Sequence, residues 1–232
     1  MIIARSISFR LLAALIFLPF ANAVHAQGEV ELRFVSFPKL VDAKPVELLV
    51  GEGQTIPVRL PTNSISTIYK VKSLGTWAIG KTVLDDKGKE SFDVYGQAPS
   101  IASPKQLILV IRKGKDDSDG LVLIPMDDRV DNFGGGKYFL MNATTADIGG
   151  SIGTGKFSLK PGSHTLIAPK PTKINGDQKY AYAQIYFRMG EEVQPFFTAT
   201  WRFNKKARSM VFFYHDPVTK QLRLHTIRDY VP

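Results

Sequence analysis

Short runs of β-branched and aromatic residues, separated by glycine, proline, asparagine or aspartate, recur along this chain of 232 residues. They are too short and too rich in β-forming residues for helices, and no helical periodicity connects them. Runs of this kind between turn-forming residues are typical of sandwiches or barrels of antiparallel strands. The sequence therefore predicts an all-β protein with strands at 30–37, 46–50, 55–60, 106–111, 121–126, 138–142, 164–168, 180–188, 196–203, 209–214 and 221–227.

Two pairs of these runs are expected to form hairpins. Runs 107–111 and 121–124 flank a polar loop, and runs 210–214 and 222–227 flank a loop in which Pro217 fixes φ for a turn. In the last run, Leu222, Leu224 and Thr226 alternate with Arg223, His225 and Ile227. We therefore expect one face of this strand in the core and the other in water.

The chain also contains weak internal matches in a constant order. They relate 121–130 to 222–231 at an offset of 101 residues, 50–55 to 159–164 at an offset of 109, and 33–37 to 138–142. Such self-similarity predicts two related units of about 100 residues. We expect two tandem antiparallel β-sandwich modules.

The predicted boundary between the modules is a glycine-rich segment at 131–136. Three consecutive glycines, Gly134 to Gly136, suit a flexible linker. A phosphate-binding loop would lead into a helix, whereas these glycines lead into a predicted strand. The sequence thus predicts modules at 27–130 and 137–232.

Residues 1–26 have the features of a cleavable export signal. Arg5 and Arg10 precede an apolar run at 11–20, and the residues that follow at 21–26 include small ones suited to cleavage after Ala26 or, as second choice, Ala23. The apolar run is shorter than a membrane span. We therefore expect a periplasmic or extracellular protein with no membrane span in the mature chain.

Composition limits the chemistry and suggests partners. The chain has no cysteine, which excludes disulfides, thiolate nucleophiles and blue copper. Without the signal's two arginines, the net charge of +9 becomes about +7. An exported basic protein is expected to meet an anionic envelope polymer, a glycan or another envelope protein rather than nucleic acid.

No cofactor or metal site is predicted. His164, His215 and His225 show no metal-ligand spacing, although His215 and His225 could approach across their hairpin beside Asp216. The acidic loop 116–120 lacks the glutamate that a calcium loop needs near its twelfth position. We expect this loop, and likewise Asp127, Asp128 and Asp131, to be solvated turns.

The sequence favours a protein that is not an enzyme. It contains no nucleophile motif of a serine hydrolase. Two adjacent acid pairs, Asp85–Asp86 and Glu191–Glu192, lie in predicted turns rather than facing each other across a cleft. A hydrolase that uses Glu191, Glu192 and Asp216 is the remaining catalytic alternative.

Aromatic residues gather in the last quarter of the chain, interleaved with arginine and lysine. Neighbouring residues on a strand point to opposite faces, so Phe196–Phe197 and Phe212–Phe213 cannot both face one core. Some ring surface must be exposed or covered by the other module. Exposed rings beside cations suit glycan or anion binding, and the candidate ligand-binding residues are Trp201, Tyr186, Arg188 and Arg202.

The segment Phe139-Leu-Met-Asn-Ala-Thr144, followed by Ile152-Gly153 and Leu159-Lys-Pro-Gly162, resembles uncharacterised exported β-sandwich proteins of planctomycete and verrucomicrobial bacteria. The match covers about 25 residues, and the first predicted module departs from it at Ser36-Phe37. The resemblance implies a cupredoxin-like or immunoglobulin-like sandwich with no known activity. The size and charge also resemble periplasmic pilus chaperones at the level of the fold. Together these observations predict a non-catalytic envelope protein with a binding or structural role.

Overall fold

The structure is a computed structural model that describes residues 28–38, 45–113, 117–216 and 219–231. The chain is all-β, with seventeen strands and one short 3-10 turn in these ranges. The predicted signal at 1–26, Asp116 and Pro217 lie outside the described residues. Within the described ranges, no helix is long and apolar enough to cross a membrane.

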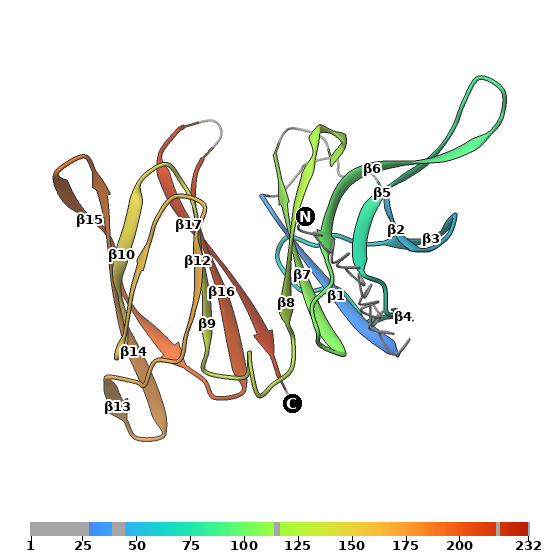
Figure 1. Ribbon diagram of the computed structural model, residues 1–232. Helices are drawn as coiled ribbons and strands as arrows, with labels where there is room; N and C mark the ends of the chain where they lie inside the picture. The colour runs from blue at the N-terminus through green and yellow to red at the C-terminus, as the bar shows by residue number, and fades with distance from the viewer. Residues whose placement is uncertain (1–27, 39–44, 114–116, 217–218, 232) are drawn as a thin grey trace, which may run out of the picture.

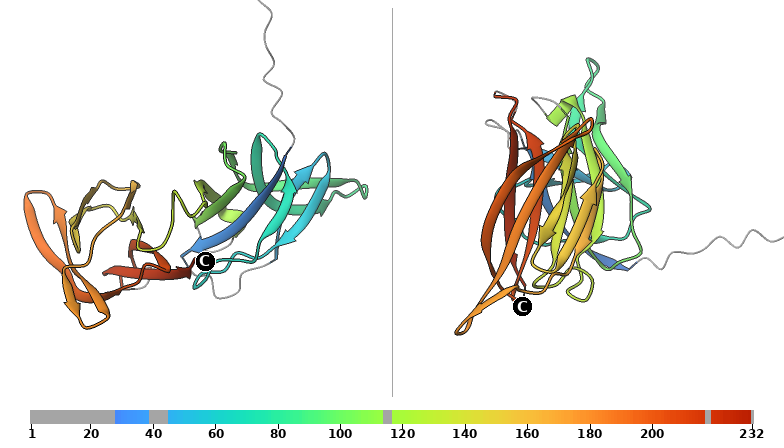
Figure 2. Two further views of the ribbon diagram at one scale, coloured as in Figure 1. Left: turned by 90° about the horizontal axis from the view of Figure 1, so that it is seen from below. Right: turned by 90° about the vertical axis from the view of Figure 1, so that its left-hand side faces the viewer.

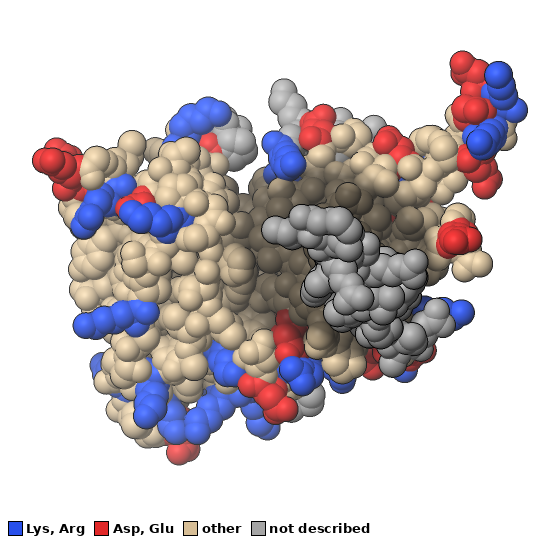
Figure 3. Space-filling model, viewed as in Figure 1, with Lys and Arg blue, Asp and Glu red and all other residues tan. Residues whose placement is uncertain are grey.

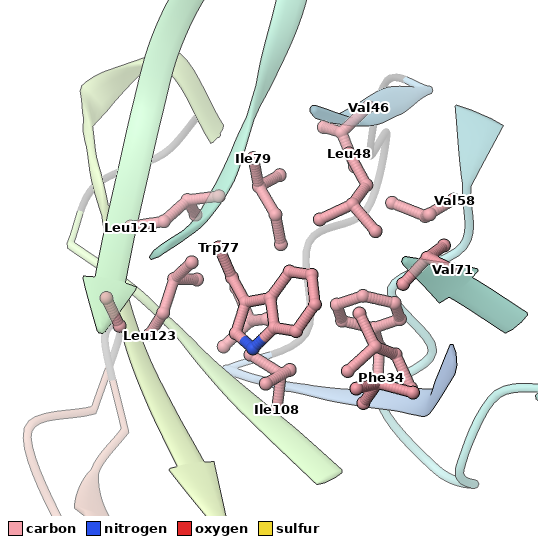
Figure 4. Close-up of a cluster of buried hydrophobic side chains, with 14 residues drawn as sticks. Phe34, Val46, Leu48, Val58, Val71, Trp77, Ile79, Ile108, Leu121 and Leu123 are labelled. Carbon is pink, nitrogen blue, oxygen red and sulfur yellow. The ribbon is translucent and has the colours of Figure 1, made fainter. Parts of the chain in front are cut away.

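The first eight strands form two four-stranded sheets that enclose a core (Figure 1). Sheet A has the order β4 (Tyr69–Lys72), β1 (Glu29–Phe37), β7 (Lys105–Arg112) and β8 (Leu121–Asp127), and sheet B has the order β3 (Gln54–Val58), β2 (Val46–Gly51), β5 (Thr76–Leu84) and β6 (Glu90–Pro99). Trp77 lies in the middle of this first core, between Phe34 of sheet A and Ile79 of sheet B (Figure 4). Its indole nitrogen donates to Gln106 at 2.8 Å, so the buried polar group is satisfied.

The remaining strands form sheets C and D around a second core. Sheet C has the order β12 (His164–Ile167), β9 (Tyr138–Ala143), β16 (Ala207–His215) and β17 (Leu222–Tyr230). Sheet D has the order β11 (Gly155–Leu159), β10 (Asp147–Ile152), β14 (Gln178–Met189) and β13 (Lys173–Asn175), and β15 (Glu192–Phe203) also pairs with β14. Leu140 and Phe213 of sheet C face Ala183 and Ile185 of sheet D.

A third core joins sheets A and C, so the two strand sets lie side by side as two lobes (Figures 1 and 2). Phe37 of β1 stacks on Phe212 of β16, with ring centroids 5.0 Å apart and planes 6° from parallel. Ile227 of β17 lies in this core and is 1% exposed. The third core therefore covers the predicted wet face of this strand at Ile227, whereas Arg223 on the same face is exposed, so the prediction of a wet face is wrong only in part.

Strand pairing follows the same order in both sets. Sheet A consists of an edge strand (β4) followed by the first, the penultimate and the last strand of the first set (β1, β7 and β8). Sheet C repeats this order with the edge strand β12 and then β9, β16 and β17 of the second set. The first and penultimate strands, β1 with β7 and β9 with β16, are parallel, whereas all other pairs are antiparallel. The predicted sheets were purely antiparallel, and the exception arises because these two strands are joined by a long crossover rather than a hairpin.

Register tests the three internal matches. Leu123 pairs with Val110 and Leu224 pairs with Phe213, each on the last strand of its set, and these places agree with the predicted offset of 101. Ser36 pairs with Val110, and Asn142 pairs with Phe213. By the same comparison, β1 matches β9 at an offset of 106 residues, whereas the sequence match of 33–37 to 138–142 has an offset of 105. A slip of one residue would exchange the two faces of the strand.

The match of 50–55 to 159–164 is wrong. The first segment is the turn between β2 and β3, which pair within sheet B, whereas the second connects β11 of sheet D to β12 of sheet C. Both segments share a glycine turn because turns draw on few residue types. Similar turn chemistry therefore does not identify equivalent positions.

All eleven predicted strands and both predicted hairpins are confirmed. The strands that the sequence did not reveal are β4, β5, β6, β10, β11 and β13. Several contain glycine, which weakens a strand signal. The structure requires some of these glycines, since a Cβ on Gly80 would lie 1.9 Å from the Asp93 carbonyl oxygen and one on Gly150 would lie 2.1 Å from that of Gln184.

The glycine segment predicted as a flexible linker is closely packed. A Cβ on Gly135 would lie 1.7 Å from the carbonyl oxygen of Lys205, and Gly136 has φ +79° with the Phe203 ring against it. Phe133 is 1% exposed and belongs to the third core. These glycines therefore permit close approach of backbone and ring.

Two arginines and two aspartates form a buried network where the lobes meet. Arg33 of β1 contacts Asp128 at 2.7 Å and Asp229 of β17 at 3.2 Å. Arg208 of β16 is 1% exposed and contacts both aspartates, donates to the Phe133 carbonyl at 2.6 Å, and lies 4.5 Å above the Phe133 ring. Asp128 is therefore not in the solvated turn that the sequence predicted.

The charges in this region stabilise one another. Burial alone would lower the pKa of Arg33, but hydrogen bonds and attraction to Asp128 and Asp229 outweigh it and raise the pKa. Nearby, hydrogen bonds from Arg129 lower the pKa of Asp127. Partial burial raises this pKa and a hydrogen bond from Ser103 lowers it further, and the result is a pKa well below the usual range. The junction is thus a structured ionic cluster.

Candidate functional site

Three of the four predicted ligand-binding residues share one surface. Tyr186 and Arg188 of β14 and Arg202 of β15 alternate with residues of the second core and point away from it. Trp201 has the opposite orientation, since it packs against the second core and stacks on Tyr138 with ring centroids 5.9 Å apart. The structure therefore does not bring Trp201 together with the other three.

Tyrosines line this outer surface of sheet D. Tyr180, Tyr182 and Tyr186 alternate with the inward-facing Ala181, Ala183 and Ile185, and we call the surface that they share the tyrosine face. Tyr182 is 41% exposed and Tyr186 is 37% exposed. With about 3.4 Å per residue, their Cα atoms lie about 13 Å apart along the strand. The face thus presents separated rings along one extended line.

Small and polar side chains surround the tyrosines. Thr200 lies opposite Tyr182 and Thr198 lies opposite Gln184 on β15, while Gly149 of β10 lies opposite Tyr186. The pattern leaves ring surface uncovered and supplies hydroxyl and amide groups that donate and accept hydrogen bonds. A polar ligand with apolar ring faces matches this composition.

A shallow depression of about 170 Å³ adjoins Tyr186. An added Cβ on Gly149 would meet only the Phe157 carbonyl oxygen, at 3.6 Å, so the missing side chain leaves space beside the ring. Ser158 lies opposite Gly149 on β11 and also lines the depression. The strands therefore position a ring, a hydroxyl and an open space together.

Charged groups border the same depression. Arg188 lies opposite Asp147 in the strand register, and the Lys160 ammonium contacts the Asp147 carboxylate at 2.6 Å. The Lys160 side chain is 79% exposed, and such pairs contribute little to stability. These donors and acceptors are therefore free to exchange their contacts for those of a ligand.

A β-bulge changes the prediction for Phe196 and Phe197. Phe197 pairs with Ile185 and Pro195 pairs with Tyr186, so Phe196 is the extra residue of the strand. Both phenylalanines pack against the second core. The predicted strict alternation is wrong here, whereas for Phe212 and Phe213 it is confirmed, because Phe212 lies in the third core and Phe213 in the second.

The predicted histidine and acid candidates do not converge. His215 pairs with Leu222, whereas His225 pairs with Phe212 and stacks near it in the third core, so the two histidines lie on opposite faces of the hairpin. Glu191 and Glu192 lie at the turn between β14 and β15. Among the described residues, no three histidine or acidic side chains are arranged to hold a metal ion.

Tyr182, Gly149 and Ser158 are members of the site that were not predicted from the sequence. Strict alternation of tyrosine with alanine over residues 180–183 could have placed Tyr182 on an outward face. Gly149 and Ser158 carried no such signal, because β10 and β11 become neighbours of β14 only in the folded sheet.

No protein-family model matches this chain, and no curated protein is similar to it in sequence. The resemblance to exported bacterial sandwich proteins remains a prediction. The quoted motif has a clear structural basis, however. Asn142 donates to the Ala146 and Leu159 carbonyls at 2.7 and 3.1 Å and accepts from the Thr144 hydroxyl at 2.7 Å, which joins the two parts of the motif.

Proposed function

We propose that this protein is an exported, non-catalytic binding protein of the bacterial cell envelope, built from two tandem β-sandwich modules, and that it binds a glycan chain. The repeated pairing order and the separate cores of the two strand sets support two modules at about 27–130 and 137–232. The predicted export signal supports a periplasmic or extracellular location.

One observation carries the glycan assignment: exposed Tyr182 and Tyr186 lie on one extended sheet surface with small neighbours. Aromatic rings stack on the apolar faces of sugars, and hydroxyl, amide and charged groups bind the sugar hydroxyls. A sheet surface with separated rings suits an extended chain, which contacts several rings at once. Each contact is weak, and the chain gains affinity by combining them.

The test is binding of soluble envelope polysaccharides to the mature protein, measured by affinity electrophoresis and then by calorimetry with oligosaccharides. We expect the double variant Tyr182→Ala/Tyr186→Ala to bind at least about tenfold more weakly, because each ring contributes about 1 kcal/mol or more. Tyr230→Ala is the matched control, since Tyr230 is 67% exposed but lies on β17 of sheet C.

Two outcomes would contradict the proposal. One is glycan binding that the double variant retains at full affinity. The other is absence of binding to every polysaccharide when the wild-type protein is folded by circular dichroism.

A further inference from the structure

A second hollow lies at the other end of sheet D from Tyr186, next to the glycine segment. This groove has a volume of about 820 Å³. Three segments line it: residues 130–137 before β9, residues 168–171 after β12, and the paired ends of β14 and β15 with Lys205. No predicted ligand-binding residue contributes to it.

Lysines dominate the lining of the groove. Lys137, Lys170, Lys179 and Lys205 come from four different places in the chain, and Asp131 is the only acid among the lining residues. Figure 3 shows lysine and arginine side chains gathered along this lower edge of the second lobe, with few acidic ones. Like charges that border one groove repel one another, so a bound anion would stabilise the arrangement.

The lysines are available to a ligand. Within the described part of the chain, no salt bridge joins Lys170, Lys179 or Lys205 to an acid. The Lys137 ammonium donates to the Asp131 carbonyl at 2.8 Å, which fixes its place in the wall. Lysine ammonium groups act as compact point charges that suit phosphate oxygens.

The backbone that carries these lysines is fixed. The Lys170 amide donates to the Thr154 hydroxyl at 2.9 Å, Lys179 pairs with Phe203 across β14 and β15, and the Lys205 carbonyl packs on Gly135. The fold therefore fixes the positions at which these three lysines line the groove.

One wall of the groove is apolar. The Phe203 ring lies against Gly136, whose missing Cβ would come within 2.9 Å of it, and Pro169 and Pro171 stand nearby. An aromatic face beside cations suits a ligand that has both an apolar ring face and negative charge. Inorganic phosphate alone would leave this wall unused.

We propose that this groove binds a phosphorylated sugar, with its ring against Phe203 and its phosphate groups on the lysines. The site is independent of the tyrosine face and does not rest on glycan binding there. The same chemistry occurs in a soluble sugar phosphate and in the headgroup of a phosphorylated glycolipid.

The experiment compares the wild-type protein with two variants of equal charge. Lys170→Gln/Lys179→Gln/Lys205→Gln removes three groove lysines, and Lys72→Gln/Lys87→Gln/Lys89→Gln removes three exposed lysines of the first lobe. The probes are a bisphosphorylated hexose in solution, vesicles with and without a phosphorylated glycolipid, and inorganic phosphate. Thermal unfolding verifies that each variant is folded.

We expect the groove variant to bind the sugar phosphate or the glycolipid vesicles at least about tenfold more weakly, with less than about a twofold change in the control. Phe203→Ala should weaken binding of the sugar probe but not that of inorganic phosphate. Binding only to vesicles would support the proposal and identify the lipid-linked source.

Equal losses in the two triple variants would overturn the proposal, because net charge alone would then explain the affinity. Failure of the wild-type protein to bind either sugar probe would overturn it as well. Tyr182→Ala/Tyr186→Ala should leave this binding unchanged, so failure here and failure at the tyrosine face are distinguishable.

Discussion

Asp128 shows how strongly a single side chain can depend on its surroundings. In the sequence it follows another aspartate near a run of glycines, which is typical of a solvated turn. In the structure it is 8% exposed and contacts Arg33 and Arg208, one from each lobe. Burial of these charges is tolerable because each retains an opposite partner.

We expect Asp128→Asn to lower the free energy of unfolding by about 3–5 kcal/mol, because it leaves the buried Arg208 and the partly buried Arg33 with only Asp229 as a counter-charge. The measurement is urea unfolding at neutral pH. Asp131→Asn, three residues away and exposed, should change stability by less than about 0.5 kcal/mol. Wild-type stability in Asp128→Asn would show that the network contributes nothing.

At the scale of elements, the segment between β8 and β9 contradicts the usual meaning of consecutive glycines. Gly135 lies against the backbone of the turn that begins β16, and Phe133 fills the third core beside it. The segment therefore fixes the second lobe on the first. It also forms one wall of the lysine groove.

Gly135→Ala should destabilise the protein by about 3 kcal/mol, because its Cβ would lie 1.7 Å from the Lys205 carbonyl oxygen and the backbone would have to shift. The matched control is Gly75→Ala, where nothing lies within 4 Å of the added atom. Both are measured by thermal and urea unfolding. If the two variants were equally stable, the segment would be the flexible linker that the sequence suggests.

At the scale of the whole molecule, the third core makes the two lobes one packed unit. Sheets A and C each have apolar residues on both faces. One face of each sheet packs in the core of its own lobe and the other face packs in the third core. The face-to-face contact includes the parallel stack of Phe37 on Phe212. The lobes should consequently stabilise each other.

A double-mutant cycle tests this coupling. Phe37→Ala and Phe212→Ala should each cost about 3–5 kcal/mol, and the double variant should lose less than the sum, because the two rings contact each other. Phe37→Ala with Phe157→Ala is the control, since Phe157 lies in the second core and the effects should add. Additive losses for Phe37 and Phe212 would contradict coupling across the third core.

Much of the fold was predictable from the sequence, because strand-forming runs, turns and alternation depend on residues close together in the chain. The eleven predicted strands, both hairpins and the outward orientation of Arg188 follow from such local patterns. Glycine-containing strands such as β10 could not be recognised, since their glycines are explained only by the approach of a neighbouring strand.

The sequence by itself determined an all-β chain, eleven of its strands, and Tyr186, Arg188 and Arg202 as residues of one outer surface of sheet D. Only the tertiary structure decided that Ile227 of β17 is covered, that Asp128 is buried, that Trp201 faces the core, and that four lysines line one groove. The reason is physical. Alternation assigns a side chain to one of two faces, but what covers each face depends on segments that are distant in the sequence.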